Sequence, residues 1–247
     1  MTAHFFFRSP ASRRAGLVAS LAASLLVGTA LPLVASGGEA AVKIAPPAVD
    51  TTTSASGMQT AVFAGGCFWG IQGVFQRVNG VVQAVSGYSG GAKETAVYEM
   101  VGSGLTGHAE SVKVTYDPKK VSYGTLLQIF FSVAHDPTQL NRQDPDSGPQ
   151  YRSAIFYADP AQKETTEKYI AQLDAAKVYP KKIVTQVVPL VAFYPAEAYH
   201  QDYLTIHPDS GYIARFDLPK IANLKAVFPQ QYRAEPALVM VRATKSQ

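Results

Sequence analysis

The chain has 247 residues, of which 47% are hydrophobic and 16% are charged. This balance is typical of a folded chain with a buried core and excludes an intrinsically disordered one. The single cysteine excludes an intramolecular disulfide, a Cys-x-x-Cys redox pair and any zinc or iron–sulfur site that needs several cysteines.

The N-terminal region has the pattern of an export signal. Arg8, Arg13 and Arg14 precede an uncharged apolar run over residues 15–35, which small residues follow. Residues 1–40 are therefore predicted to be a signal peptide, with a short match to a twin-arginine signal, and the mature chain is expected to be periplasmic or secreted. The alternative is a permanent membrane anchor, against which Gly28 and Pro32 argue.

The formal charge of +4 depends largely on this segment. Residues 1–40 hold three of the 22 basic residues and one of the 18 acidic ones, which leaves 19 and 17. A nearly balanced chain without a basic cluster gives no reason to expect nucleic-acid binding, and no stable membrane association is expected after cleavage.

Beyond the signal, residues 41–59 are rich in Pro, Thr, Ser and Ala and predict a flexible linker. A single domain is expected over residues 60–232, followed by a C-terminal tail over 233–247. In chain order, its periodicity predicts a strand over 60–64, a helix over 67–78, strands over 81–85 and 110–116, a helix over 123–133, a polar loop over 136–150, a strand over 153–157, a helix over 160–176, a strand over 183–188 and a short helix over 196–204. This irregular alternation predicts an α+β sandwich with a mixed or antiparallel sheet.

Cys67 follows Gly65-Gly66 at the expected start of a helix. A helix N-terminus presents unpaired N–H groups and partial positive charge, both of which favour a thiolate. The two glycines allow a sharp turn that is expected to leave the sulfur accessible. The alternative is that Cys67 is a small buried apolar residue.

Several short blocks resemble the A-type peptide methionine sulfoxide reductases, in the order in which that family carries them. The blocks are Gly66-Cys67-Phe68-Trp69-Gly70, Gly87-Tyr88-Ser89-Gly90-Gly91, Tyr98, Gly107-His108-Ala109-Glu110, Tyr116-Asp117-Pro118, His135-Asp136-Pro137-Thr138, Gln150-Tyr151-Arg152-Ser153 and Ala196-Glu197-Ala198-Tyr199-His200-Gln201. The resemblance covers residues 60–232. It implies a ferredoxin-like two-layer fold with an extended C-terminal coil, and the reduction of methionine S-sulfoxide, free or in proteins.

The resemblance also implies a role for each matching residue. Cys67 would attack the sulfoxide sulfur and become a sulfenic acid, while Glu110 would protonate the oxygen. Tyr98 and Tyr151 would hydrogen-bond that oxygen. The substrate-binding residues would be Phe68 and Trp69, which form an apolar wall for the S-methyl group, and Asp146.

Other interpretations remain for these residues. Tyr98 and Tyr151 are two of 13 tyrosines and could be ordinary core or surface residues, Phe68 could belong to the core, and Glu110 could be an exposed acid. His108, His135, His200 and His207 match no zinc spacing and are expected to be structural, so no metal is expected. A cysteine hydrolase that pairs Cys67 with a histidine, or a non-catalytic exported relative, are the alternative functions.

The lone cysteine has a consequence for the expected cycle. Many relatives resolve the sulfenic acid with further cysteines near the C-terminus, whereas this chain resembles the one-cysteine branch. Regeneration must then come from an external thiol: a thioredoxin-like protein, glutaredoxin with glutathione, or dithiothreitol. No bound cofactor is expected, the protein is expected to be a monomer, and Asp144 stands where many relatives have glycine.

Overall fold

The structure is a computed structural model that describes residues 39–51 and 57–240. Residues 1–38 of the predicted signal peptide lie outside these residues, as does part of the C-terminal tail. Within the described ranges, no helix combines the length and the apolarity that a membrane span requires.

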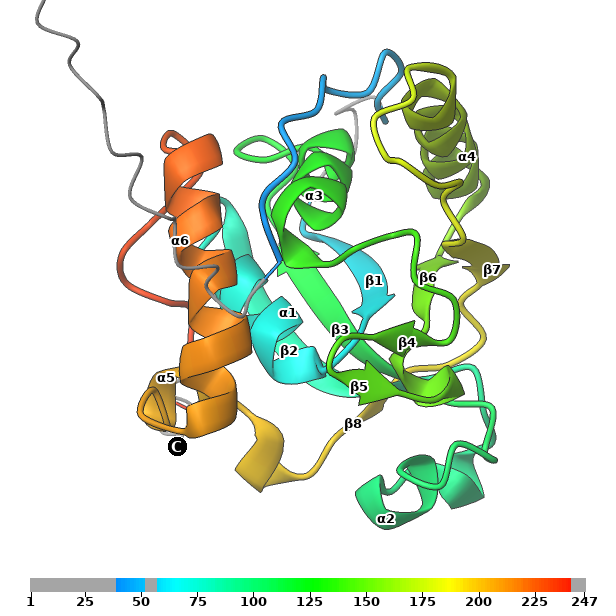
Figure 1. The fold of residues 1–247 in the computed structure, drawn as a ribbon, viewed down its shortest axis with the longest axis vertical. Helices are drawn as coiled ribbons and strands as arrows, with labels where there is room; N and C mark the ends of the chain where they lie inside the picture. The colour runs from blue at the N-terminus through cyan, green and yellow to red at the C-terminus, as the bar shows by residue number, and fades with distance from the viewer. Residues whose placement is uncertain (1–38, 52–56, 241–247) are drawn as a thin grey trace, which may run out of the picture. The chain divides into compact units, whose positions relative to one another are not determined.

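Six strands form one mixed sheet in the order β7-β6-β1-β3-β2-β8 (Figure 1). The strands are β1 (Gln59–Gly65), β2 (Val81–Ser89), β3 (Ala109–Tyr116), β6 (Ser153–Tyr157), β7 (Gln186–Pro189) and β8 (Tyr194–Pro195). β1 pairs antiparallel with β3 and β6, and β2 pairs antiparallel with β3. The central order β6-β1-β3-β2, with a helix after β1 and another after β3, is the ferredoxin-like topology, so the expected fold class is confirmed.

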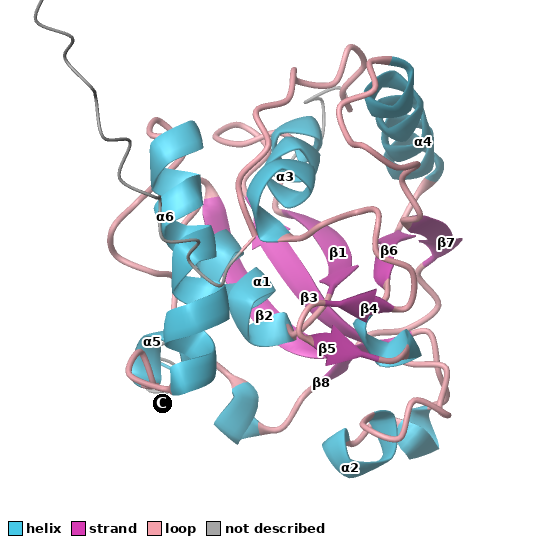
Figure 2. Ribbon diagram, in the orientation of Figure 1, coloured by secondary structure: helices cyan, strands magenta, loops and turns pink. Residues whose placement is uncertain are grey.

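The helices are α1 (Phe68–Gln76), α2 (Tyr98–Val101), α3 (Tyr123–Ile129), α4 (Pro160–Ala175), α5 (Tyr203–Ile206) and α6 (Leu218–Val227). In Figure 2, α1 and α3 lie in front of the sheet. Ser122 caps α3 by accepting a hydrogen bond from the backbone N–H of Thr125, and Asp159 caps α4 through Gln162. These caps explain why both helices begin where the sequence pattern places them.

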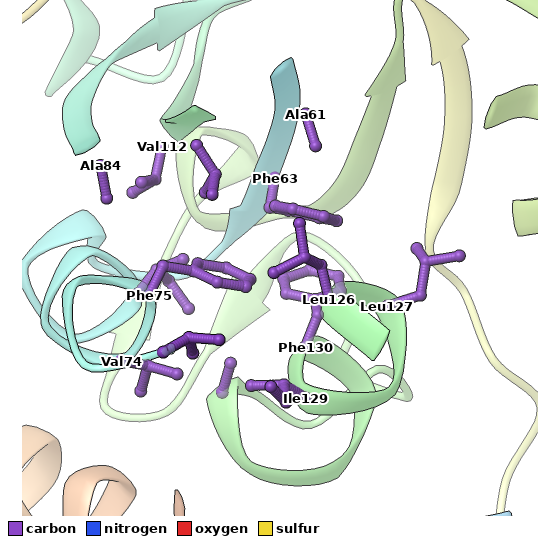
Figure 3. Close-up of a cluster of buried hydrophobic side chains, with 14 of the residues drawn as sticks. Ala61, Phe63, Val74, Phe75, Ala84, Val112, Leu126, Leu127, Ile129 and Phe130 are labelled. Atoms are coloured by element: carbon purple, nitrogen blue, oxygen red, sulfur yellow. The ribbon is translucent and has the colours of Figure 1, made fainter. Parts of the chain in front are cut away.

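The core follows from the alternation of β1. Ala61 and Phe63 face the helices and join the large core cluster, whereas Val62 and Ala64 face the opposite side in a smaller cluster. Phe63 lies between Phe75 of α1 and Phe130 at the end of α3, with ring centroids 4.9 and 5.0 Å apart (Figure 3). This aromatic contact fixes α1 against the sheet, and with it the residue that precedes the helix.

The C-terminal part of the domain differs from the expected extended coil. A wide helical turn over Ile213–Asp217 leads into α6, which packs on α1. Pro219 does not stop this helix because it lies in the first turn, where the missing N–H has no intrahelical partner to lose. The expected helix over 196–204 is also divided: Asp202 has a φ of 60° and separates a short turn over Ala198–His200 from α5.

Residues 39–51 comprise the last two residues of the predicted signal peptide and the first part of the linker predicted over 41–59, and contacts with the domain hold them in place. This N-terminal segment runs beside α3 (Figure 1), where Val42 exchanges hydrogen bonds with Ser132. Further along, the carbonyl of Ala45 accepts a hydrogen bond from Tyr169, and the carboxylate of Asp50 accepts one from Gly124 N at 2.7 Å. The segment is thus a strap across the α3–α4 layer, held by partners that lie far away in the sequence.

α1 has no room for a side chain at Gly70. A Cβ atom there would lie 2.2 Å from Oδ1 of Asp217, a carboxylate that is fully buried. Gly70→Ala is therefore predicted to destabilise the protein, because overpacking costs about 1–3 kcal/mol, which outweighs the roughly 1 kcal/mol that alanine gains over glycine in a helix.

Urea unfolding measures this difference. Gly211→Ala is the matched control, since a Cβ atom there meets nothing within 4 Å and the variant is expected to be as stable as wild type or slightly more so. Equal stabilisation by the two substitutions would show that the Asp217 contact does not constrain α1.

Candidate active site

Cys67 lies at the junction between β1 and α1, as the N-cap residue of the helix. It is 8% exposed and lines a cavity of about 190 Å³. The other lining residues are Phe68, Trp69, Tyr98, Glu110, Asp146, Tyr151 and Tyr212. All seven residues singled out from the sequence therefore meet in one cavity, although they come from six different elements or turns.

The turn before the cysteine is held by Gly66. Its φ of +94° suits glycine, and a Cβ atom would lie 2.6 Å from the side chain of Gln143. Gln143 begins the turn of the hairpin formed by β4 (Arg142–Gln143) and β5 (Asp146–Ser147), which brings Asp146 to the cavity. Asp144 is accommodated at the tip of this hairpin, where its carboxylate pairs with Arg142.

Glu110 is the second member of the site and is not an exposed acid. It is 4% exposed on β3, and its Oε2 accepts a hydrogen bond from the backbone N–H of Phe68 at 3.0 Å. Burial raises the pKa of this carboxyl to about 8, against the lowering effect of the Phe68 bond, and the nearby Asp146 raises it further. Glu110 is therefore mainly protonated at neutral pH and holds a proton that it can donate.

Tyr98 and Tyr151 add two hydroxyl groups. Tyr98 starts α2 and is 36% exposed, and its backbone N–H donates to Glu197 at 3.0 Å. Burial and the charge of Glu110 raise the pKa of both phenols, so both remain neutral hydrogen-bond donors. The cavity thus holds a thiol, a protonated carboxyl and two hydroxyl groups, which together can polarise an oxygen atom bound between them.

Asp146 is joined by Tyr212, a residue that the sequence pattern did not single out. The Tyr212 hydroxyl donates a hydrogen bond to Asp146 Oδ2, and burial raises the pKa of that carboxyl. Tyr212 lies just before the wide turn that leads into α6, a region expected to be coil. No local spacing distinguishes it from the other tyrosines, so only the tertiary fold identifies it.

The apolar wall of the cavity is supported from behind by His200. Trp69 stacks on Tyr203 with ring centroids 3.8 Å apart, and its indole N–H donates to Nδ1 of His200 at 3.2 Å. Phe68, 1% exposed, also contacts the His200 ring at 5.0 Å. Phe68 is therefore both a core residue and a wall of the cavity, while His200 holds the tryptophan in place.

The environment of the resting thiol differs from the expectation of a favoured thiolate. Burial raises the pKa of Cys67 well above its ordinary value, and the carboxylates of Glu110 and Asp217 raise it further. A backbone hydrogen bond involving Trp69, from the helix N-terminus, acts in the opposite direction but does not outweigh them. The sulfur is also less accessible than the two glycines suggested, because it is reached within the cavity rather than at the surface.

His108 and His135 have buried hydrogen-bond partners that explain them as structural residues. His108 contacts Gly91 N and the carbonyl of Ala92, and His135 contacts Phe130 O and Ser153. Burial lowers the pKa of His135 to about 4. Within the described part of the chain, no group of three or more His, Cys, Asp or Glu side chains is placed to hold a metal ion, and none of the described residues that line the cavity is a histidine.

Comparison with known proteins identifies relatives that are named peptide methionine sulfoxide reductases. The chain is 63% identical over 187 residues to peptide methionine sulfoxide reductase MsrA 2 of Mesorhizobium japonicum, a match that covers 76% of this chain and 96% of that protein. It is 48% identical over 197 residues to MsrA 2 of Synechocystis, covering 78% and 92% of the two chains.

Solved structures of the same class have a similar fold. Methionine sulfoxide reductase A of Corynebacterium diphtheriae superposes with a TM-score of 0.54 at 36% identity, covering 70% of this chain and 87% of that one. Reduced Mxr1 of Saccharomyces cerevisiae superposes with a TM-score of 0.57 at 34% identity, covering 63% and 88%. Because the profile of the family described as peptide methionine sulfoxide reductase also matches residues 59–232, the chain belongs to that family.

Proposed function

We propose that this protein reduces methionine S-sulfoxide, free or within proteins, to methionine, with Cys67 as the nucleophile. The observation that carries this proposal is the meeting of Cys67, Glu110, Tyr98 and Tyr151 in one cavity of about 190 Å³. The likeness of the chain to named methionine sulfoxide reductases supports the same reaction.

The reaction balances with the groups present. The Cys67 sulfur attacks the sulfoxide sulfur, an S–S bond forms, and Glu110 protonates the oxygen. The hydroxyl oxygen then passes to the Cys67 sulfur: a Cys67 S–O bond forms while the methionine S–O bond and the transient S–S bond both break, so the products are methionine and a Cys67 sulfenic acid. The proton that Glu110 gives up is replaced by the proton of the Cys67 thiol, so the step consumes no net proton.

Each neighbouring group has a defined task in this scheme. Tyr98 and Tyr151 donate hydrogen bonds to the sulfoxide oxygen, and these bonds strengthen as negative charge develops there. Trp69 and Phe68 receive the S-methyl group, since both rings border the cavity. Asp146, tied to Tyr212, holds the polar part of the substrate.

The raised pKa of Cys67 fits an order in which substrate binds first. A bound sulfoxide draws the Glu110 proton towards its oxygen, and the resulting carboxylate accepts the thiol proton. The thiolate then forms next to its target, shielded from other oxidants and electrophiles.

The cysteine hydrolase alternative lacks a general base in this site. A thiol hydrolase needs a histidine within hydrogen-bond reach of sulfur, and the described residues that line the cavity include none. The assay described below separates the proposed reductase from a relative that has lost turnover.

We also propose that the protein acts as a monomer in the periplasm or outside the cell, where it repairs oxidised proteins. The signal-like pattern of residues 1–40 supports export. Because the chain has one cysteine, an external thiol must attack the sulfenic acid and then resolve the mixed disulfide. A thioredoxin-like protein or a glutaredoxin with glutathione supplies it, and dithiothreitol replaces them in an assay.

The reaction is tested with methionine S-sulfoxide, dithiothreitol and chromatographic detection of methionine. Wild type is expected to form methionine and Cys67→Ser to form none, because the hydroxyl cannot replace the thiolate. Ester and peptide hydrolysis are measured alongside. Absence of methionine with wild type, or full activity of Cys67→Ser, would refute the proposed function.

Glu110→Gln tests the acid. The single-turnover rate at neutral pH is expected to fall roughly 10²–10⁴-fold, since positioned proton transfer contributes that much. The ratio of wild-type to Glu110→Gln rates isolates the titration of this carboxyl, because glutamine does not ionise. That ratio is expected to be constant below about pH 8 and to fall above it, as the wild-type acid loses its proton. A ratio independent of pH would remove Glu110 from the role of acid.

One turnover without added thiol tests the half-cycle. Each chain is expected to yield one methionine and to gain one oxygen atom on Cys67 by mass spectrometry, because no second cysteine can form a disulfide. Addition of glutathione should convert this species into a mixed disulfide and then restore the thiol. Repeated turnover without any added thiol would contradict the scheme.

A further inference from the structure

Two buried charges lie beside α1, and neither of them lines the cavity. Asp217 is fully buried and Lys220 is 6% exposed, with Nζ of the lysine 3.3 Å from Oδ1 of the aspartate. Asp217 ends the wide helical turn before α6, and Lys220 lies in the first turn of that helix. The reaction described above uses neither side chain.

The pair is in direct contact with the helical turn that follows Cys67. A Cβ atom at Gly70, three residues after the cysteine, would lie 2.2 Å from Asp217 Oδ1 and 3.0 Å from Lys220 Nζ. Asp217 Oδ2 is buried without a hydrogen-bond partner among the described residues. Asp217 makes no side-chain cap to α6 either, so its carboxylate serves α1 and Lys220 rather than its own helix.

Stability alone does not explain this pair. Two charges removed from water lose hydration, and apolar side chains of similar size often serve a fold equally well. By contrast, Asp217 without Lys220 would leave an uncompensated negative charge next to the cysteine turn. Lys220 thus neutralises the negative charge that Asp217 would otherwise present to the turn after Cys67.

Cys67 is surrounded mainly by groups that oppose its ionisation. The groups that face it electrostatically are Glu110 from β3, Asp146 from β5, Asp217, Lys220, Tyr98, Tyr151 and Tyr212. The carboxylates raise the pKa of the thiol. Lys220 has the opposite sign: a Cys67 thiolate raises the pKa of Lys220, and because the attraction is mutual the ammonium stabilises the thiolate equally.

Lys220 has neighbours on two further elements. Asp217 raises its pKa and keeps it charged despite burial, and in the uncleaved chain Glu39, which lies in the segment predicted to be removed with the signal, raises it further. Glu39 itself has a pKa raised to about 7 by burial, and Lys220 acts to lower it. Lys220 also lowers the pKa of Asp146 and of His135. The ammonium is therefore the centre of a buried charge cluster that reaches from the strap to the cavity.

We propose that Lys220, held by Asp217, is a positioning residue for Cys67: its ammonium cancels the aspartate charge against the first turns of α1 and so allows the thiol to ionise during the reaction. The benefit to catalysis rests on the proposed function. The effect on the thiol itself does not, so the two can be tested separately.

The test measures the rate at which iodoacetamide alkylates Cys67 as a function of pH, which reports the thiolate fraction. Lys220→Met is expected to shift the profile upwards by about one pH unit or more, so that alkylation near neutral pH slows at least roughly tenfold. Asp217→Asn is expected to shift it downwards. The double variant Asp217→Asn/Lys220→Met, which removes both charges, is expected to lie between the two single variants.

Lys225→Met is the matched control, because Lys225 lies on the same helix but is exposed. It should leave the profile unchanged. Circular dichroism and thermal unfolding establish that each variant is folded; if Lys220→Met does not fold, the downward shift in Asp217→Asn and the position of the double variant decide the question. A purely structural role would move both single variants in the same direction or neither, and either result would overturn the proposal.

Sulfoxide reduction by wild type with dithiothreitol is measured in parallel. Opposite shifts in alkylation without wild-type reductase activity would support the electrostatic role and refute the proposed function. Wild-type activity without opposite shifts in alkylation would support the proposed function and overturn the electrostatic role of Lys220.

Discussion

The hydrogen bond from the backbone N–H of Phe68 to Glu110 connects the two halves of the chemistry. It joins the first residue of α1 to the second residue of β3, 42 positions later in the chain. The nucleophile stands immediately before this N–H, and the acid is the acceptor. Any movement of α1 relative to the sheet therefore changes the spacing between sulfur and proton donor, and the rest of the domain keeps that spacing fixed.

Two kinds of packing hold α1 in place. On one side, Phe63 lies between Phe75 and Phe130, so the helix is packed against β1 through closely spaced aromatic rings. On the other side, Asp217 and Lys220 lie against Gly70, where no side chain fits. An apolar contact positions the helix, and a charged contact beside it adjusts the field at its N-terminus.

The same buried setting keeps both the acid and the nucleophile protonated, and this combination suits one reaction. Burial keeps Glu110 protonated near neutral pH and keeps the Cys67 thiol un-ionised. When a sulfoxide oxygen accepts the proton of Glu110, the resulting carboxylate can accept the proton of the Cys67 thiol. The resting thiol is thus expected to react slowly with electrophiles until a hydrogen-bond acceptor of the right shape enters.

Local pattern predicted much of this arrangement, and the reasons for its failures are physical. Some signals act over only a few residues and can be recognised in the sequence alone: the glycine pair before Cys67, the apolar spacing of α1 and the cap of α4. The prediction of a flexible linker failed for the strap, because its order comes from hydrogen bonds to Ser132 and Tyr169, which lie far away in the sequence. The helix after Tyr212 was not predicted, because the family resemblance implied an extended coil there; Pro219 is compatible with this helix, since the first turn of a helix tolerates proline. Tyr212 itself shares a cavity with Asp146 only because α6 folds back on α1.

The shape of the cavity also orders the catalytic cycle. Cys67 is 8% exposed and the space before it is about 190 Å³, whereas Tyr98, which also lines this cavity, is 36% exposed. An external thiol must reach the same sulfur through the space that the methionine side chain has occupied. Methionine therefore has to leave before regeneration begins, and the two substrates alternate at one sulfur, as in a ping-pong scheme. With a second cysteine in the chain the resolving thiol could arrive from within the protein; with one, access through this cavity sets which reductants can serve the enzyme.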